Sequence, residues 1–288
     1  MEPMVSVVIP TYERKELLGI AVASVLAQGF KEFELIVVDD ASRDGSREYL
    51  DSLREVDSRL RPVYLEEHLG FPGAVRNRGV EIARGSLIAF LDSDDRWLEE
   101  KLELQVPLHG EGGFRITHTR ERWLRKGREI SQKGQTHRRE GDIFTDALGK
   151  CIIGPSTAMV DRRLLEELGG FDEELEVAED YELWLRVTAR EAVGYLEVPL
   201  TEKHAGHGDQ LSEKYGQIEG FRIEALRRLL SRDALPRERR QEAVAALAGK
   251  LEIFASGARK RGRLREADSL EAEARQLREG EVFQGETT

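Results

Sequence analysis

The chain has 288 residues, of which 40% are hydrophobic, so it can bury a substantial core and is not disordered. Its formal net charge of -11 argues against a general nucleic-acid-binding protein, because such proteins neutralise phosphates with clustered Lys and Arg. No apolar run approaches the roughly 20 residues of a transmembrane helix, and the N-terminus lacks a signal-peptide pattern. The single cysteine, Cys151, suggests a reducing compartment. We expect a cytoplasmic protein, soluble or at most peripheral at the inner face of the membrane.

Four short apolar runs rich in Val and Ile alternate with helical patterns in the first hundred residues. The runs are 5–10, 33–40, 61–66 and 86–92, and the helical patterns are 15–28, 46–53 and 73–84. Continuous apolar runs indicate strands that are buried on both faces of a parallel sheet. The order β-α-β-α-β-α-β predicts a Rossmann-like α/β domain with a mostly parallel central sheet and helices on both faces.

Acidic residues stand at the carboxyl ends of these predicted strands. The ends read Pro10-Thr11-Tyr12, Asp39-Asp40 and Asp92-Ser93-Asp94-Asp95. In open α/β sheets, ligands bind beyond the carboxyl ends of the strands. We therefore expect the acids to converge on a binding site at one edge of the sheet.

The second part of the chain is less regular. Strands are predicted at 112–119, 121–126 and 193–200, a strand followed by a helix at 155–171, a helix at 181–190 and a polar loop at 201–216. Residues 217–280 are rich in Ala, Leu, Glu and Arg, with breaks near Pro236 and Gly262. This composition predicts two or three helices.

The stretch "LDSDD" places three aspartates within four residues. One interpretation is capping, in which a helix begins at Arg96 and Asp94 or Asp95 accepts its free N–H groups. One cap needs a single carboxylate, however, and the others would repel it. The alternative is a site for Mg²⁺ or Mn²⁺, which takes one or two protein carboxylates together with water and substrate phosphates. In extended backbone Asp92 and Asp94 point to the same side, which leaves Asp95 as the cap.

Several ordered motifs resemble family 2 glycosyltransferases with the GT-A fold. They are "VSVVIPTYERKELLGIAVASVLAQGFKEFELIVVDDASRDGS", "GFPGAVRNRGVEIARGSLIAFLDSDDRW" and "PSTAMVDRRLLEELGGFDEELEVAEDYELWLRV". The resemblance covers residues 5–212. It implies a nucleotide-sugar-binding half at 1–105 and an acceptor-binding half at 106–212, followed by a helical C-terminal extension at 213–288.

The resemblance also implies roles for individual residues. The implied nucleotide-sugar-binding residues are Pro10, Thr11, Tyr12, Glu13, Asp40, Arg76, Asn77, Asp92, Ser93, Glu179 and His207. Tyr12 stacks on the base and Asp40 contacts it, whereas Glu13 and Val75 stand where Asn and Ala are usual. The implied ligands of Mn²⁺ or Mg²⁺ are chiefly Asp94, with Asp92 and His207, and the implied catalytic base is Asp180.

The chemistry of sugar transfer agrees with these roles. A cation held by Asp94 neutralises the charge that builds on a departing diphosphate. Asp180, at the start of a helix, is placed to accept the proton of the attacking hydroxyl. A single base opposite the leaving group implies direct displacement with inversion. Each residue also has a plain structural explanation: Asp180 and Glu179 as first-turn acids, Tyr12 as rim packing, Asp40 as a cap and His207 as a solvated loop residue.

We predict a metal-dependent, inverting glycosyltransferase that moves a sugar from a nucleotide-diphosphate sugar to an acceptor hydroxyl, on a glycan or lipid-linked glycan in cell-surface polysaccharide synthesis. Two alternatives stay open, a nucleotidyltransferase of similar architecture and a non-catalytic nucleotide-sugar-binding scaffold. The motifs do not specify the sugar, the base or the acceptor.

Two basic segments bear on the partners. Residues 120–139 hold eight Lys and Arg against two Glu, which agrees equally with a solvated loop and with an anionic acceptor. The cluster "RKRGRLR" at 259–265 agrees with packing on the core or on a second subunit as a homodimer, and with contact to an anionic membrane. No nucleic-acid partner is expected.

Overall fold

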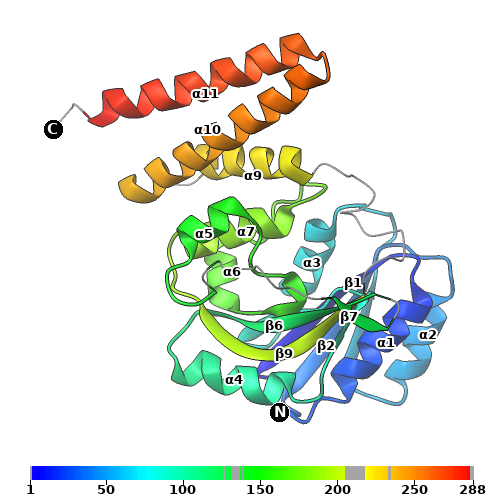
Figure 1. The fold of residues 1–288 in the computed structure, drawn as a ribbon. Coiled ribbons are helices and arrows are strands. Elements are labelled where there is room, and N and C mark those ends of the chain that lie inside the picture. The colour runs from blue at the N-terminus through cyan, green and yellow to red at the C-terminus, as the bar shows by residue number, and fades with distance from the viewer. Residues whose placement is uncertain are drawn as a thin grey trace.

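The computed structural model describes residues 2–125, 127–130, 137, 139–204, 218–232 and 235–285 (Figure 1). Its strands are β1 (Val5–Thr11), β2 (Phe33–Asp39), β3 (Leu60–Tyr64), β4 (Leu87–Phe90), β5 (Asp95–Trp97), β6 (Ile116–Arg125), β7 (Arg128–Ile130), β8 (Ala158–Asp161) and β9 (Gly194–His204). Its helices are α1 (Lys15–Leu26), α2 (Ser46–Arg54), α3 (Pro72–Glu81), α4 (Lys101–Glu111), α5 (Phe144–Gly149), α6 (Arg162–Leu168), α7 (Glu179–Thr188), α9 (Ile218–Arg232), α10 (Arg237–Lys260) and α11 (Leu264–Gly285), with a short 3₁₀ helix η1 (Pro155–Thr157).

The first four strands confirm the predicted alternation of strands and helices. β1 pairs in parallel with β2 and β4, and β2 pairs in parallel with β3. Alternate residues of β1 face opposite sides of the sheet, so Val7 packs with residues of α1, α2 and α4, whereas Val8 packs with residues of α3, α6 and α7. Both faces are therefore buried, which is why these strands are continuous apolar runs in the sequence.

Beyond β4 the sheet is mixed. The strand order among the described residues is β3-β2-β1-β4-β8-β6-β9-β5, with β7 paired to β6. β8 runs antiparallel to β4 and β6, β9 runs parallel to β6, and β5 runs antiparallel to β9. β1 to β4, β6 and β9 thus share one direction, which agrees with the predicted mostly parallel sheet. Since β5 lies among strands of the second half, the predicted halves interleave, and their boundary stays a prediction.

Three local predictions are wrong. Residues 95–97 form β5, paired with residues 201–203 of β9, so no helix begins at Arg96. Helix α4 begins at Lys101 after Glu100, which makes no side-chain cap hydrogen bond, so neither Asp94 nor Asp95 is its cap. Residues 201–204, predicted as the start of a polar loop, belong to strand β9, which ends at His204. Each error comes from strand pairing between segments far apart in sequence, which a local pattern does not encode.

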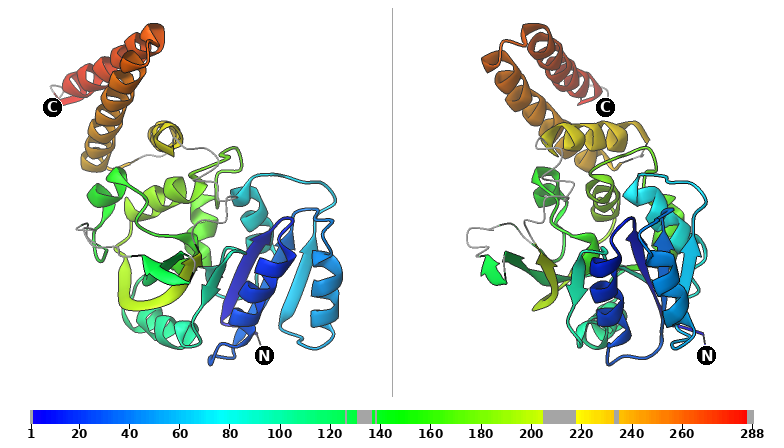
Figure 2. Two further views of the ribbon diagram at one scale, coloured as in Figure 1. Left: turned by 45° about the vertical axis from the view of Figure 1, so that its right-hand side comes forward. Right: turned by 90° about the vertical axis from the view of Figure 1, so that its right-hand side faces the viewer.

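Helices α9, α10 and α11 confirm the predicted helical C-terminal extension, which lies on the α5 and α7 side of the α/β domain (Figure 1). α9 and α10 share an apolar core with α7 that includes Tyr181, Leu185, Leu229 and Leu247. α10 and α11 lie side by side and project from the domain, as Figure 2 shows. The described residues of 259–265 are exposed at the turn between these two helices. No described helix is long and apolar enough to span a membrane.

Lys101 is fully buried beneath β6 and η1. Its Nζ donates to Gln105 Oε1 at 2.7 Å and to the Thr157 carbonyl at 3.1 Å, and lies 5.0 Å from the centre of the Trp97 ring. Because these partners are neutral, burial lowers the pKa of Lys101 well below its usual value of 10.5.

Wild-type stability should therefore rise with pH relative to the variant Lys101→Met. Between the lowered folded pKa of Lys101 and 10.5, the unfolded chain holds a proton that the folded chain lacks. The wild type then gains up to about 1.4 kcal/mol of unfolding free energy per pH unit. Urea unfolding of both proteins between about pH 7 and pH 10 measures the difference. A difference that stays constant would mean that Lys101 is protonated when folded.

Candidate active site

The loops after β1 and β2 form one side of the candidate site. Thr11, at the end of β1 after Pro10, accepts the Asp40 N–H through its carbonyl at 2.9 Å. Glu13 has a left-handed backbone with φ of 50°, and its Oε1 accepts the Arg43 N–H at 2.7 Å. Glu13 thus ties the two loops together. Its predicted contact with the nucleotide base stays a prediction.

Tyr12 and Asp40, the two residues predicted to recognise the base, meet at His68, which the sequence did not single out. The rings of Tyr12 and His68 stack with centroids 3.8 Å apart. Asp40 is buried, and its carboxylate accepts the N–H groups of Leu69 and Gly70 at 2.7 and 3.0 Å and lies 2.9 Å from His68 Nδ1. Asp40 therefore fixes the segment before α3, and α2 begins after Gly45 without an Asp40 cap.

Arg76 joins the ends of β4 and α7. Its buried guanidinium donates through Nη2 to Asp92 Oδ1 at 2.7 Å and through Nη1 to Glu179 Oε1 at 2.6 Å. This bridge brings the "DSD" step and the "ED" step, which are far apart in sequence, to the same place. Arg76 and Glu179, both predicted to line the donor pocket, therefore lie at the predicted edge of the sheet.

The two carboxylates that Arg76 bridges differ in their pKa. Burial raises the pKa of Glu179 to about 7 against the effect of Arg76, and the charge of Asp180 adds to the rise. Burial would raise the pKa of Asp92 as well, but the charges of Arg76 and Lys203 lower it below its usual value. Asp92 is consequently ionised at neutral pH, whereas Glu179 is partly protonated near pH 7.

The three aspartates after β4 have different surroundings. Asp92 and Asp94 keep 26% and 15% of their side-chain surface exposed, and Asp94 lies 3.4 Å from the Arg14 guanidinium. Asp95 is buried and accepts from Ser156 Oγ at 2.6 Å, and burial with the charges of Asp92 and Asp94 raises the pKa of Asp95 well above its usual value. Asp95 therefore helps to hold the segment after β4 through its hydrogen bond with Ser156. Ser93 is buried between Asp92 and Asp94.

Asp92 and Asp94 fit a divalent cation whose shell is completed by phosphates. Mg²⁺ and Mn²⁺ accept oxygen ligands and typically use one or two protein carboxylates. Among the described residues, no group of three or more His, Cys, Asp and Glu side chains is arranged to hold a metal by itself. Two partly exposed carboxylates suit a cation that a diphosphate helps to bind. His207, the predicted third ligand, lies outside the described residues.

Asp180 lies in the first turn of α7. The residue before this helix, Ala178, has a left-handed φ of 66°, which costs a non-glycine residue about 1 kcal/mol and fixes the direction in which α7 starts. Asp180 Oδ1 accepts the Tyr181 N–H at 2.6 Å, and Oδ2 lies 3.5 Å from Cys151 Sγ. Asp180 is partly exposed, and its predicted role as the base stays a prediction.

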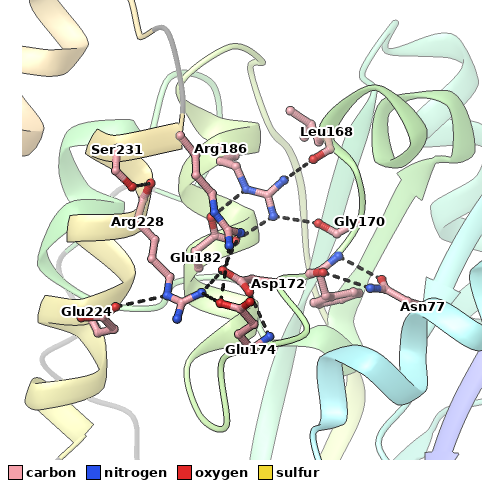
Figure 3. A network of polar contacts seen from close by, with 12 residues as sticks. Asn77, Leu168, Gly170, Asp172, Glu174, Glu182, Arg186, Glu224, Arg228 and Ser231 are labelled. Carbon is pink, nitrogen blue, oxygen red and sulfur yellow. Dashed lines mark hydrogen bonds and ion pairs between the residues drawn. The ribbon is translucent and has the colours of Figure 1, made fainter.

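Asn77 of α3 is hydrogen-bonded to the loop between α6 and α7 (Figure 3). Its Nδ2 donates to the Phe171 carbonyl at 2.9 Å, and its Oδ1 accepts the Phe171 N–H at 3.0 Å. On the other side of the loop, the buried carboxylate of Asp172 accepts from Arg228 of α9 at 2.8 Å. The loop is therefore held between α3 and α9. Both ends of the Asn77 amide are thus engaged with this loop, and the predicted contact of Asn77 with the donor stays a prediction.

Lys203 of β9 lies among the acids of the site and was missed by the sequence analysis. Its Nζ is 3.5 Å from Glu121 Oε2 and 3.8 Å from Asp95 Oδ2. Burial alone would lower the pKa of Lys203, but the surrounding acids, which include Asp92 and Asp180, raise it above its usual value. No local pattern marks this lysine, because the pairing of β9 with β5 and β6 brings it here.

Further cations lie near Lys150 and Cys151, the two residues that follow α5. Burial and the charges of Arg139 and Arg222 lower the pKa of Lys150. The charges of Arg222 and Lys203 also act on the Cys151 thiol, which touches Asp180. Arg139 belongs to the basic segment 120–139, of which residues 126, 131–136 and 138 lie outside the described residues. Lys203 thus acts on the candidate base, and Arg222 acts on the thiol beside it.

The sequence is similar to those of known glycosyltransferases. The model of the family "Glycosyl transferase family 2" matches residues 6–169. TuaG of Bacillus subtilis, a glycosyltransferase named for teichuronic acid biosynthesis, is 34% identical over 201 residues, which are 67% of this chain and 75% of TuaG. WfgD of Escherichia coli, named a UDP-Glc:alpha-D-GlcNAc-diphosphoundecaprenol beta-1,3-glucosyltransferase, is 32% identical over 184 residues, 64% of this chain and 69% of WfgD.

Solved structures share the fold at lower sequence identity. S. aureus TarS 1-349 in complex with UDP-GlcNAc has a TM-score of 0.72 and 24% identity, over 91% of this chain and 75% of that chain. The mannosyltransferase PcManGT from Pyrobaculum calidifontis, in complex with GDP-Man and Mn2+, has a TM-score of 0.62 and 17% identity, over 99% of this chain and 89% of that chain.

The α/β fold shared with these solved structures, together with the family model and the two relatives, defines a GT-A enzyme of the glycosyltransferase class. Within that class, the chain belongs to glycosyl transferase family 2. The resemblance read from the sequence motifs is confirmed.

Proposed function

We propose that the enzyme transfers a sugar from a nucleotide-diphosphate sugar to a hydroxyl of an anionic acceptor, with a divalent cation and by direct displacement. The observation that carries this proposal is the Arg76 bridge between Asp92 and Glu179. It places the carboxylates suited to a cation and diphosphate next to the helix start that bears Asp180.

Each step of transfer has a group in the site. Tyr12 offers an exposed ring to a nucleotide base beside Asp40. Asp94 and Asp92 are the residues to hold Mn²⁺ or Mg²⁺, which when bound stabilises the negative charge of the leaving diphosphate. Asp180 accepts the proton of the acceptor hydroxyl as that oxygen attacks the anomeric carbon. Attack from the side opposite the diphosphate inverts the anomeric configuration.

The acceptor is proposed to be anionic because Arg222 and Lys203 act on the Cys151 thiol beside Asp180, and Lys150 is the residue next to Cys151 in the chain. A neutral hydroxyl acceptor has no need of several cations, whereas a phosphate or diphosphate gains from each of them. The name of WfgD specifies an acceptor sugar linked through diphosphate to undecaprenol, which is an acceptor of this class.

A lipid-linked acceptor also brings the enzyme to the cytoplasmic face of a membrane. Residues 259–265, at the exposed turn between α10 and α11, are the candidate contact, and the same helices are the candidate dimer interface.

The two alternatives predict different products. A nucleotidyltransferase releases pyrophosphate from a nucleoside triphosphate, and a scaffold releases nothing. Family membership and the approach of Asp180 to the candidate cation site favour sugar transfer over both.

A donor panel tests the proposed reaction directly. The purified protein is incubated with UDP-glucose, UDP-GlcNAc and GDP-mannose, each with and without Mn²⁺, and nucleoside diphosphate and pyrophosphate are quantified. We expect nucleoside diphosphate from one donor, dependent on Mn²⁺, and an inverted anomeric centre in the product by NMR. Pyrophosphate release from a nucleoside triphosphate, or a retained configuration, would contradict the proposal.

The charge reversal Lys150→Glu should weaken the use of a charged acceptor. With polyprenyl-diphosphate-linked GlcNAc the KM is expected to rise about tenfold, because one attraction near the phosphate becomes a repulsion. With uncharged octyl-GlcNAc the KM should stay within about twofold. Lys31→Glu is the matched control, since Lys31 is exposed before β2 at the opposite edge of the sheet. Equal effects on both acceptors would remove the anionic-acceptor assignment.

A further inference from the structure

The thiol of Cys151 lies against the carboxylate proposed as the base. Cys151 follows α5, and its Sγ is 3.5 Å from Asp180 Oδ2 and 3.3 Å from the Ile153 carbonyl oxygen. It is the single cysteine of the chain and is partly buried. The main-chain N–H of Tyr181 donates to the other carboxylate oxygen of Asp180, Oδ1, at 2.6 Å. Each oxygen of Asp180 therefore has one donor from the protein.

The thiol keeps its proton in this environment. Burial raises the pKa of Cys151 well above its usual value, and the charge of Asp180 adds to the rise against Arg222 and Lys203. A protonated thiol is a hydrogen-bond donor and a poor nucleophile. Its proton has two acceptors within reach, the Asp180 carboxylate and the Ile153 carbonyl.

We propose that Cys151 is a positioning residue for Asp180, whose thiol holds Oδ2 of the ionised carboxylate in the orientation that accepts the proton of the acceptor hydroxyl. This inference rests on the proposed function. During the step, the hydroxyl proton moves to Asp180 while the sulfur keeps its own proton, which turns to the Ile153 carbonyl once the carboxylate is neutral. Together with the Tyr181 N–H, the thiol thus stabilises the charged form of the base. Glu179 on α7 and Lys203 on β9 also interact with Asp180, and Arg222 on α9 acts on the thiol.

The contact between Cys151 and Asp180 can be tested without measuring enzyme turnover, because Asp180 affects the chemical reactivity of the thiol. The rate of reaction of Cys151 with iodoacetamide is measured against pH in the wild type and in Asp180→Asn. Because removal of the neighbouring charge raises the thiolate fraction, the variant should react about tenfold faster at neutral pH. Asp146→Asn, which removes an acid from the neighbouring helix α5, is the matched control and should react like the wild type. Identical rates in the wild type and in Asp180→Asn would sink the inference.

The positioning role is tested with Cys151→Ala and Cys151→Ser, in Mn²⁺-dependent hydrolysis of the donor that the panel identifies. Cys151→Ala loses the hydrogen-bond donor to Asp180, so kcat should fall about tenfold. The acidic limb of the profile of kcat against pH should move to higher pH, whereas the KM of the nucleotide sugar should not change. Cys151→Ser keeps a hydrogen-bond donor at this position and should restore both kcat and its pH profile. A merely structural cysteine would instead lower the melting temperature of both variants and leave the profile in place.

The outcomes separate this inference from the proposed function. If Asp180→Asn keeps its turnover, the proposed base is wrong. If Asp180→Asn is inactive but Cys151→Ala has the wild-type rate and profile, the base stands and the positioning role falls.

Discussion

Asp180→Asn should reduce sugar transfer by about 10²- to 10⁴-fold, the usual contribution of a general base. The amide keeps the shape of the carboxylate and its contact with the Tyr181 N–H but cannot take up the hydroxyl proton. Donor binding should stay near the wild-type level, because the base-binding loops and the aspartates after β4 are unchanged. Initial rates with the donor from the panel, together with calorimetry of UDP and Mn²⁺, measure both quantities.

Glu166→Gln is the control for this loss, since Glu166 is an exposed acid on α6. Its rate should match the wild type. A wild-type rate in Asp180→Asn itself would show that another group takes the proton, and Glu179, with a pKa of about 7, is the neighbouring candidate.

Asp94→Ala should abolish the effect of Mn²⁺ on the binding of a nucleoside diphosphate. In the wild type, calorimetry with UDP should show at least about tenfold tighter binding when Mn²⁺ is present, because the cation links the diphosphate to the carboxylates. Without Asp94, Asp92 remains paired with Arg76 and cannot hold the cation alone. Metal-free binding is not expected to fall, since the variant removes a negative charge that would repel a diphosphate when no cation is present.

Asp95→Asn is the matched control for Asp94→Ala. Asp95 is adjacent in sequence, but its carboxylate is buried against Ser156 and its pKa is raised, so an amide can replace it. This variant should keep its response to Mn²⁺. If Asp94→Ala responds to Mn²⁺ as strongly as Asp95→Asn, the cation is held elsewhere.

The parallel part of the fold could be predicted because its information is local. Continuous apolar runs such as residues 33–40 specify strands buried on both faces, and the intervening helices then determine a parallel order. The same logic places Asp40 and Asp92 at one edge, and the structure has both there. The prediction that these acids meet needed no knowledge of the second half of the chain.

The rest of the site depends on contacts that no local pattern contains. Residues 95–97 form a strand because β9 arrives beside them, and Lys203 enters the site through the same pairing. The bridge that Arg76 makes between Asp92 and Glu179 joins two segments far apart in sequence, so it could not be predicted either. His68 follows no strand or helix signal and reaches Tyr12 only because Asp40 holds the segment after it.

The hold of α9 on the loop before α7 has a consequence for engineering. Asn77 on α3 and Arg228 on α9 grip this loop from opposite sides, and α9 also covers Tyr181 and Leu185 of α7. A protein that ends after β9, at residue 204, keeps the loop and α7 but lacks the second grip and exposes apolar side chains of α7. Chimeras between relatives therefore need to exchange α3, the loop, α7 and α9 as one cassette if the acceptor specificity is to move with them.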